Sequence, residues 1–350
     1  MLKEKFKENR LIVCIYEMIM NPIHRLELKF LKFVKKFPKK FAKTRFTYGK
    51  RNTDKVFYII KCNASDCGLF SLILVNVLPF LKVSKEKKYI PIIDYKSTEY
   101  LQLIQDKQNY GKDNPWEYYF EQPGGNYFLS EVYESANVEM CNQNKHGFKE
   151  VHWNSMMPMP KKQLEYWSQI ANEYIRPTKE VLQRIYDEKN KMFLSQRKIM
   201  GVSIRAGYRR AALLNLEIIK NHPKVNNCEY YIQKIEEKMK EWGYGMFFLA
   251  CEDREYVTKM DNYFGDRCCH MDRRYRHMFI NDIPVADIEE LNREYEGSTI
   301  RETTIEYIIE TYLLASCDSL YSTIGGGAQF AYIVNGGKYK NVEIYNEGMY

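Results

Sequence analysis

An arginine and a run of three glycines are the residues of this sequence best suited to chemistry. Arg205 directly follows the apolar run 199–204, and about 120 residues later Gly325, Gly326 and Gly327 precede an apolar helical run. A guanidinium can bind two phosphate oxygens at once, and the free amides at the start of a helix also bind phosphate. Together they predict a site for the pyrophosphate of a nucleotide-diphosphate donor.

Neighbouring residues extend this predicted donor site. Gly207 and Arg209 follow Arg205 within the same turn, and Ser322 and Thr323 place two hydroxyl donors just ahead of the glycines. The arginine could instead form a structural ion pair at a strand end. The glycines could form an ordinary tight turn, although three in a row favour a very close backbone approach.

Two carboxylates complete the candidate set. Glu252 and Asp253 follow the apolar run 246–250, which reads as a buried strand. Carboxylates at such a position can accept hydrogen bonds from a nucleobase edge or a ribose. The alternative is that Asp253 caps the helix that begins near Arg254, and one residue could serve both purposes.

The sequence predicts no metal site and no cofactor apart from a nucleotide-sugar co-substrate. The chain contains no Asp-x-Asp motif, which disfavours a carboxylate-bound cation. Its nine cysteines show no Cys-x-x-Cys pair and no zinc-site spacing, so we expect reduced thiols in a cytoplasmic protein.

Charge is concentrated at the N-terminus. Residues 1–51 hold 15 Lys or Arg and 4 Asp or Glu, a net charge of +11, which leaves −3 for residues 52–350 of a chain with +8 in total. This first segment mixes apolar and basic residues, as in a helix lying on an anionic membrane surface or docked on the protein body. We therefore expect a helical arm that places the protein at the inner face of the membrane, and no nucleic-acid partner.

The first half reads as a βαβ unit. An apolar strand over 56–60 is followed by a helical run over 69–83 and a second strand over 89–94. Asp94 falls where a Rossmann ribose carboxylate would lie, but without Gly-x-Gly-x-x-Gly no dinucleotide site is predicted. Residues 109–128 form an aromatic loop suited to a sugar pocket or, equally, to packing between domains.

The second half alternates strands and helices, which predicts a parallel sheet covered on both faces. A helix over 168–191, kinked or broken at Pro177, connects the two halves. The expected fold is α/β, with two Rossmann-like domains over 52–190 and 191–350 that face a cleft. The expected elements are strands at 199–205, 246–250, 318–324 and 342–345, and helices at about 230–241, 254–263, 301–316 and 328–335.

Three of these stretches, in this order, resemble motifs of the fucosyltransferase clan, which includes α1,6-, nodulation, α1,2- and protein O-fucosyltransferases. Residues 203–209 resemble the clan's first motif, a strand that ends in His-x-Arg-Arg-x-Asp. They keep its first arginine as Arg205 but lack the histidine, the second arginine and the aspartate. Residues 249–253 resemble the clan's second motif, an apolar strand that ends in Ala-Thr-Asp-Asp. Residues 322–332 resemble its third motif, a strand followed by a Ser/Thr-rich turn and a helix. In the first half, residues 68–71 and 114–123 resemble proteins of bacterial surface-polysaccharide loci.

The resemblance implies a GT-B fold and an inverting, metal-independent transfer of fucose from GDP-fucose to a glycan of the cell surface. Arg205 would hold the β-phosphate, the glycine run with Ser322 and Thr323 the diphosphate, and Glu252 and Asp253 the nucleoside. A general base would remove the proton of the acceptor hydroxyl. Its candidates in the first half are Asp66, Asp94 and Glu121.

Two alternatives stay open at this point. The same fold could use another GDP- or UDP-sugar. Alternatively, the protein could be non-catalytic and bind sugars or act as a scaffold at the membrane. The residues missing from the first motif slightly favour this alternative. Arg205 together with the glycine run favours the enzyme, because a scaffold does not need a pyrophosphate site.

Overall fold

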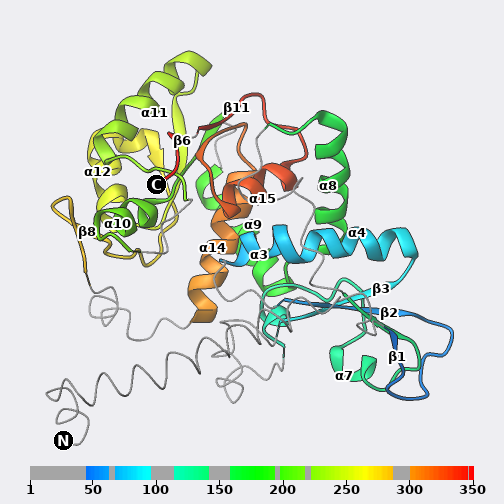
Figure 1. The fold of residues 1–350 in the computed structure, drawn as a ribbon. Helices are drawn as coiled ribbons and strands as arrows, with labels where there is room; N and C mark the ends of the chain where they lie inside the picture. Colours follow the sequence, from blue (N-terminus) through cyan, green and yellow to red (C-terminus); the bar gives the residue numbers. More distant parts are fainter. Residues whose placement is uncertain are drawn as a thin grey trace, which may run out of the picture. The chain divides into compact units, whose positions relative to one another are not determined.

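The computed structural model describes residues 45–62, 68–95, 114–141, 158–193, 198–216, 222–286, 300–345 and 347–350. Residues 45–350 form one compact unit with two sheets (Figure 1). Most of the predicted basic arm lies outside the described residues. Its last residues, 45–51, are extended, and the first two of them join the N-terminal sheet.

The N-terminal sheet has the strand order β1-β4-β2-β3. Strand β2 is parallel to both β3 and β4, whereas β1 is antiparallel to β4. The helix between β2 and β3 contains a π-helical segment, and it continues beyond the predicted end at residue 83. The bounds are β1 Arg45–Phe46, β2 Phe57–Lys61, α3 Leu69–Leu72, η2 Ile73–Val77, α4 Leu78–Lys87, β3 Ile90–Asp94, η3 Pro115–Tyr118, α7 Leu129–Val132 and β4 Val138–Met140.

The single connecting helix predicted over 168–191 is two helices. Helix α8 covers Lys161–Tyr174 and α9 covers Lys179–Phe193. The break includes Pro177, whose ring has no N–H to donate and disfavours helical geometry in the residue before it. The prediction of a kink or break at this proline is confirmed, while the helical region begins earlier than expected.

The C-terminal sheet is fully parallel, with the order β11-β10-β5-β6-β7. The bounds here are β5 Ile199–Ile204, α10 Ala206–Leu213, α11 Cys228–Trp242, β6 Met246–Cys251, α12 Arg254–Phe264, η6 Gly265–Arg267, β7 Cys268–Cys269, β8 Phe279–Ile280, β9 Ile283–Pro284, α14 Ile300–Ala315, β10 Ser319–Thr323, α15 Gly326–Asn335 and β11 Val342–Tyr345. Strands β8 and β9 form a separate antiparallel hairpin.

Helices cover both faces of the C-terminal sheet, as predicted. Phe247 and Leu249 pack with α11 and α12, whereas Phe248 and Ala250 pack with α14 and the N-terminal half. Successive side chains of a strand point to opposite faces, so β6 is buried on both sides. Figure 1 shows α10, α11 and α12 on one side of this sheet and α9, α14 and α15 on the other.

One hydrophobic core joins the two halves. The ring of Phe70 stacks on Phe330 with centroids 4.7 Å apart and meets the edge of Tyr307 at 5.0 Å. These contacts place α3 directly against α15 and α14. The two-sheet α/β architecture is therefore confirmed, and the exact domain boundaries stay predictions.

Candidate functional site

The candidate site lies where the C-terminal sheet ends. Strands β10, β5 and β6 are parallel neighbours, so the residues that follow them meet at one edge. Arg205 is the N-cap residue of α10 and Gly325 that of α15. A Cβ atom on Gly325 would lie 3.3 Å from Cγ of Arg205. The two features that predicted a phosphate site thus lie side by side.

Arg205 is held by a carboxylate and an aromatic ring. Its Nε lies 3.8 Å from Oε1 of Glu252, and its guanidinium carbon lies 5.4 Å from the ring centroid of Tyr208. The negative charge of Glu252 raises the pKa of Arg205 further above its ordinary value. The arginine side chain is 36% exposed, so it can still meet a ligand. Oε1 of Glu252 also accepts a hydrogen bond of 3.1 Å from the amide of Gly207.

The glycine run is buried, and its close contacts are with the protein itself. A Cβ on Gly326 would lie 2.7 Å from the amide nitrogen of Ser71, and one on Gly327 would lie 2.7 Å from the hydroxyl of Tyr307. The expected helix start at residue 328 is wrong, because α15 begins at Gly326. The close backbone approach inferred from the sequence is present, and it joins α15 to α3 and α14.

The hydroxyls of Ser322 and Thr323 face the backbone of the sheet. Thr323 Oγ1 donates to the carbonyl of Ser203 at 3.3 Å, and Ser322 Oγ donates to the carbonyl of Thr323 at 2.7 Å. Both side chains are buried. The N–H groups of the first turn of α15 have no acceptor within their helix, as at any helix start. The predicted phosphate contacts of these residues stay predictions.

Asp253 is a fully buried N-cap for α12. Its Oδ1 accepts the amide of Tyr256 at 3.0 Å and its Oδ2 the amide of Met278 at 2.8 Å. Burial raises the pKa of Asp253 to about 6, which the two amide hydrogen bonds partly oppose. The alternative reading of Asp253 as a cap is confirmed. Its predicted contact with a nucleoside stays a prediction.

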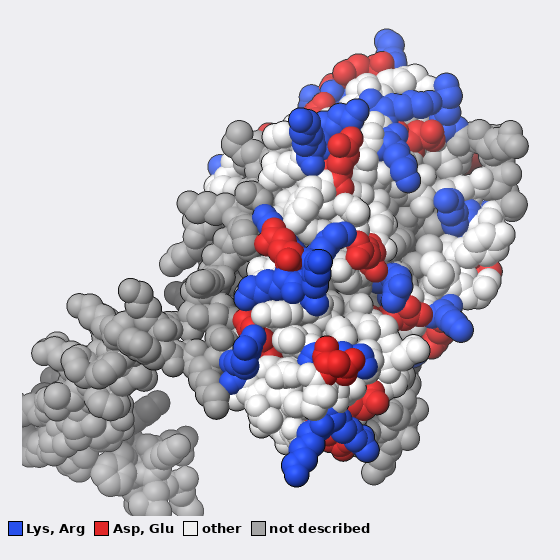
Figure 2. Space-filling view, turned by 90° about the vertical axis from the view of Figure 1, so that its right-hand side faces the viewer, with Lys and Arg blue, Asp and Glu red and all other residues white. Residues whose placement is uncertain are grey.

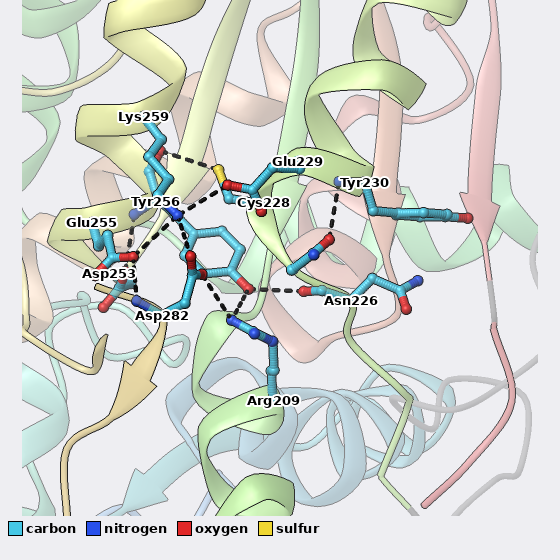
Figure 3. A network of polar contacts seen from close by, with 11 residues as sticks. Arg209, Asn226, Cys228, Glu229, Tyr230, Asp253, Glu255, Tyr256, Lys259 and Asp282 are labelled. Atoms are coloured by element: carbon cyan, nitrogen blue, oxygen red, sulfur yellow. Dashed lines mark hydrogen bonds and ion pairs between the residues drawn. The ribbon is translucent and has the colours of Figure 1, made fainter. Parts of the chain in front are cut away.

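Arg209 points toward Tyr256 and toward Asp282 in the turn of the β8–β9 hairpin (Figure 3). Its Nη1 donates to the hydroxyl of Tyr256 at 3.3 Å and lies 3.7 Å from Oδ1 of Asp282. Its guanidinium carbon lies 4.8 Å from the ring centroid of Phe279. These contacts give Arg209 a structural role, and its predicted role in donor binding stays a prediction.

The structure describes two of the three candidate bases. Asp66 lies outside the described residues. Asp94 ends β3 and is buried, while Glu121 is half-exposed and its Oε2 lies 3.3 Å from Nε of Arg176. The choice among them is therefore open.

The aromatic loop packs in the interior. The described part of the loop, residues 114–128, buries Trp116, Tyr119 and Phe120 completely. The ring of Trp116 lies 4.6 Å from that of Phe120, and its indole N–H donates to the carbonyl of Glu121 at 3.0 Å. The packing interpretation of this loop therefore accounts for Trp116, Tyr119 and Phe120, whereas Phe128 at its end is 51% exposed.

Sequence reasoning missed a buried charged cluster beside Glu252. Nη1 of Arg273 lies 3.1 Å from Oε2 of Glu310, and its Nε lies 3.9 Å from Oε2 of Glu306. Burial raises the pKa of Glu310 to about 7, which the charge of Arg273 opposes and that of Glu252 reinforces. Oε1 of Glu310 accepts no hydrogen bond from the described residues.

A signal for this cluster exists in the sequence. Glu306 and Glu310 are four residues apart in the mostly apolar C-terminal part of α14, so both lie on one face of it. Tyr307 lies between them in the chain, and burial raises its pKa to about 12. An acid in an apolar helix requires a buried partner, but the sequence does not identify Arg273 as that partner.

The described residues contain no group of three or more His, Cys, Asp or Glu arranged to hold a metal ion. The cysteines among them are free thiols. No helix within the described ranges is both long and apolar enough to cross a bilayer.

Comparison with known proteins returns solved structures of fucosyltransferases. NodZ α-1,6-fucosyltransferase soaked with GDP-fucose is 14% identical, with a TM-score of 0.43 over 80% of this chain and 92% of that chain. Fucosyltransferase NodZ from Bradyrhizobium is 13% identical, with a TM-score of 0.42 over 79% and 92%. POFUT1 in complex with GDP is 10% identical, with a TM-score of 0.40 over 83% and 98%.

No family model matches the chain, and no curated protein matches it.

Proposed function

We propose that this protein is a glycosyltransferase that transfers fucose from GDP-fucose to a glycan acceptor. The observation that carries the proposal is the contact between Arg205 and Gly325 at the edge of a parallel sheet. Ligands of open α/β sheets bind outside the carboxyl ends of the strands. There the partly exposed guanidinium lies beside the start of α15, and both attract the two phosphates of a nucleoside diphosphate.

In the proposed reaction, the acceptor hydroxyl attacks the anomeric carbon of the donor sugar. A C–O bond forms with inversion, the bond from this carbon to the β-phosphate breaks, and GDP leaves. The transition state resembles an oxocarbenium ion, as in glycoside chemistry. Arg205 would neutralise the charge that develops on the departing diphosphate. A base from the N-terminal half would take the hydroxyl proton.

Glu252 would orient the arginine in this reaction. Its carboxylate is fixed by the amide of Gly207 and lies beside the guanidinium, so it limits the directions in which Arg205 can point. Because the absence of Asp-x-Asp disfavours a bound cation, we also propose that transfer needs no metal. The proposed setting is surface-glycan synthesis at the inner face of the membrane, as the resemblance implies.

A thermal-shift titration with GDP, UDP, CMP, GDP-fucose and GDP-mannose tests the donor. A ligand that binds the native state at a hundred times its Kd stabilises it by about 2.7 kcal/mol. We expect stabilisation by GDP and GDP-fucose in the native chain and none in Arg205→Ala. Stabilisation by UDP would assign another donor to the same fold. No response to any nucleotide would contradict the enzyme and favour the scaffold.

A further inference from the structure

The β8–β9 hairpin exposes two isoleucines on either side of a tight turn. Ile280 and Ile283 pair across the hairpin and are 50% and 68% exposed. No large hydrophobic side chain among the described residues is more exposed than Ile283. The turn residues Asn281 and Asp282 have φ values of 50° and 62°, as two-residue hairpin turns require. Grouped apolar side chains in water mark a surface that another surface covers.

A network of charges holds this turn in place (Figure 3). Nζ of Lys259 lies 2.7 Å from Oδ2 of Asp282, and it also contacts Glu229 at 3.0 Å and Glu255 at 3.2 Å. The amide of Asp282 donates to Oε1 of Glu255 at 2.9 Å. The hairpin is therefore fixed to α11 and α12, and Asp282, the carboxylate nearest the isoleucines, shares Lys259 with Glu229 and Glu255.

Two arginines beside this hairpin have no carboxylate partner among the residues that the structure describes. Arg254 and Arg276 are exposed, and they are adjacent because the amide of Arg254 donates to the carbonyl of Arg276 at 2.8 Å. Arg254 begins α12, next to Glu255, which binds the hairpin turn. Within the described ranges neither arginine forms an ion pair, and Arg254 instead lies 5.0 Å from the ring centroid of Tyr275.

Charges are distributed differently on another face of the molecule. Figure 2 shows the side that carries α4 and α8, where basic and acidic side chains are interspersed. Lys85 contacts Glu173 at 2.5 Å and Lys87 contacts Glu139 at 3.2 Å. That face therefore differs from the hairpin region, where two arginines lie beside exposed isoleucines.

We propose that Arg254, Arg276, Ile280 and Ile283 form a hairpin surface that docks onto an anionic phospholipid membrane. Apolar side chains enter the boundary between headgroups and acyl chains, while basic side chains bind anionic lipid headgroups. A carboxylate at the tip would be repelled by such lipids; Lys259, which Asp282 shares with Glu229 and Glu255, and Arg209 both lie beside Asp282 and reduce this repulsion. The proposal concerns the body of the protein and is independent of the donor and of the N-terminal arm.

Vesicle co-sedimentation of the full chain tests the surface. Wild-type protein should bind vesicles that contain phosphatidylglycerol more tightly than vesicles of phosphatidylcholine alone. Ile280→Ser with Ile283→Ser, and separately Arg254→Gln with Arg276→Gln, should each weaken binding to the anionic vesicles by about tenfold. The matched control is Leu182→Ser with Tyr186→Ser on α9, whose side chains are 53% and 60% exposed and lie outside the hairpin surface. The control should bind as the wild type does.

Binding that is equal in all three double variants would overturn the proposal, even if the arm binds the membrane. A second result would also overturn the proposal: the wild type forms a dimer and does not bind vesicles, and the isoleucine variant is a monomer. The surface would then belong to contact with a second copy of the chain.

A tryptophan placed at the hairpin locates the contact directly. The Ile283→Trp variant is mixed with anionic vesicles whose lipids are brominated on their acyl chains. These lipids should quench the fluorescence of the introduced tryptophan, because its ring enters the bilayer boundary. Leu182→Trp is the matched control and should show no added quenching. Equal quenching in the two variants, or none in Ile283→Trp, would contradict docking through the hairpin. Melting temperatures close to that of the wild type show that each variant is folded.

Discussion

The two sheets of this protein end in different ways. The C-terminal sheet places Arg205 and Glu252 at its carboxyl edge, and the arginine keeps part of its surface open. At the end of the N-terminal sheet, the side chains of Asn114 and Gln122 form hydrogen bonds with the backbone N–H and carbonyl of Ile93. Both edges come from βα units of similar pattern, but Arg205 at the first edge is partly exposed whereas Asp94 at the end of β3 is buried. We infer that the donor belongs to the C-terminal sheet and that the N-terminal half provides packing and the acceptor side.

The largest expected effect separates these two edges. Arg205→Ala should abolish stabilisation by GDP and reduce transfer at least about a hundredfold, since a charge that stabilises the leaving group is lost. Glu121→Gln, in the N-terminal half, should keep the GDP-dependent shift whatever it does to turnover. Thermal shift and a fucosyl-transfer assay measure both variants. Undiminished turnover in Arg205→Ala would contradict the assignment of Arg205 to the donor site.

The buried cluster predicts a pH dependence of stability. The pKa of Glu310 is about 7 in the native state and lies near 4.3 in an unfolded chain. The native state therefore binds the extra proton between these values, and stability should fall as pH rises through this window. The loss is about 4 kcal/mol if Glu310 acts alone. Denaturant unfolding of wild type and Glu310→Gln between pH 4 and 8 measures it, and an equally steep fall in the variant would contradict the assignment.

Asp253 should matter for stability more than an ordinary cap does. Asp253→Ala removes the N-cap of α12 and leaves the amide of Met278 buried without an acceptor, at a cost of about 2–3 kcal/mol. The matched control is Asn227→Ala, because the Asn227 cap of α11 accepts a single hydrogen bond, from Tyr230, at 3.1 Å. This variant should lose about 1 kcal/mol. Equal losses in urea unfolding would show that the bond to Met278 contributes nothing.

The smallest effect concerns the junction between the two halves. Gly326→Ala places a methyl group against the backbone of Ser71 and should cost about 2 kcal/mol through overpacking. Gly68→Ala, at the opposite side of this junction, adds a methyl group with no atom within 4 Å and has an ordinary φ of −59°. It should be close to neutral. If the two alanines changed the free energy of unfolding equally, the close approach of α3 to α15 would not be needed.

The sequence predicted the local structure well, because it depends on short-range patterns. Alternating apolar strands and amphipathic helices revealed the parallel sheet, and the positions of Arg205 and Gly325 after neighbouring strands implied their meeting. Contacts between distant residues were not predictable in this way. Nothing in the glycine run indicates that Ser71 faces Gly326, and nothing near Arg209 shows that its side chain turns toward Asp282.

The buried carboxylate of Glu310 is another case in which a contact between distant residues was not predictable from the sequence. Glu310 is visible in the sequence as a charge in an apolar helix, but its partner Arg273 precedes it by 37 residues in an irregular segment. The pairing depends on how that segment runs beside β6, where the amides of Arg276 and Met278 are held by Glu252 and Asp253. Local propensity does not encode such a path.

The amides at the end of β3 also affect how this protein behaves in a crowded solution. β3 is the edge strand of the N-terminal sheet, and an open edge can recruit a strand from another molecule. Asn114 and Gln122 occupy the N–H and carbonyl of Ile93, and Asn114 also accepts the amide of Tyr95. Near the end of the strand, these two side chains therefore take the place that an intruding strand would fill, and they protect an apolar sheet against edge-to-edge aggregation.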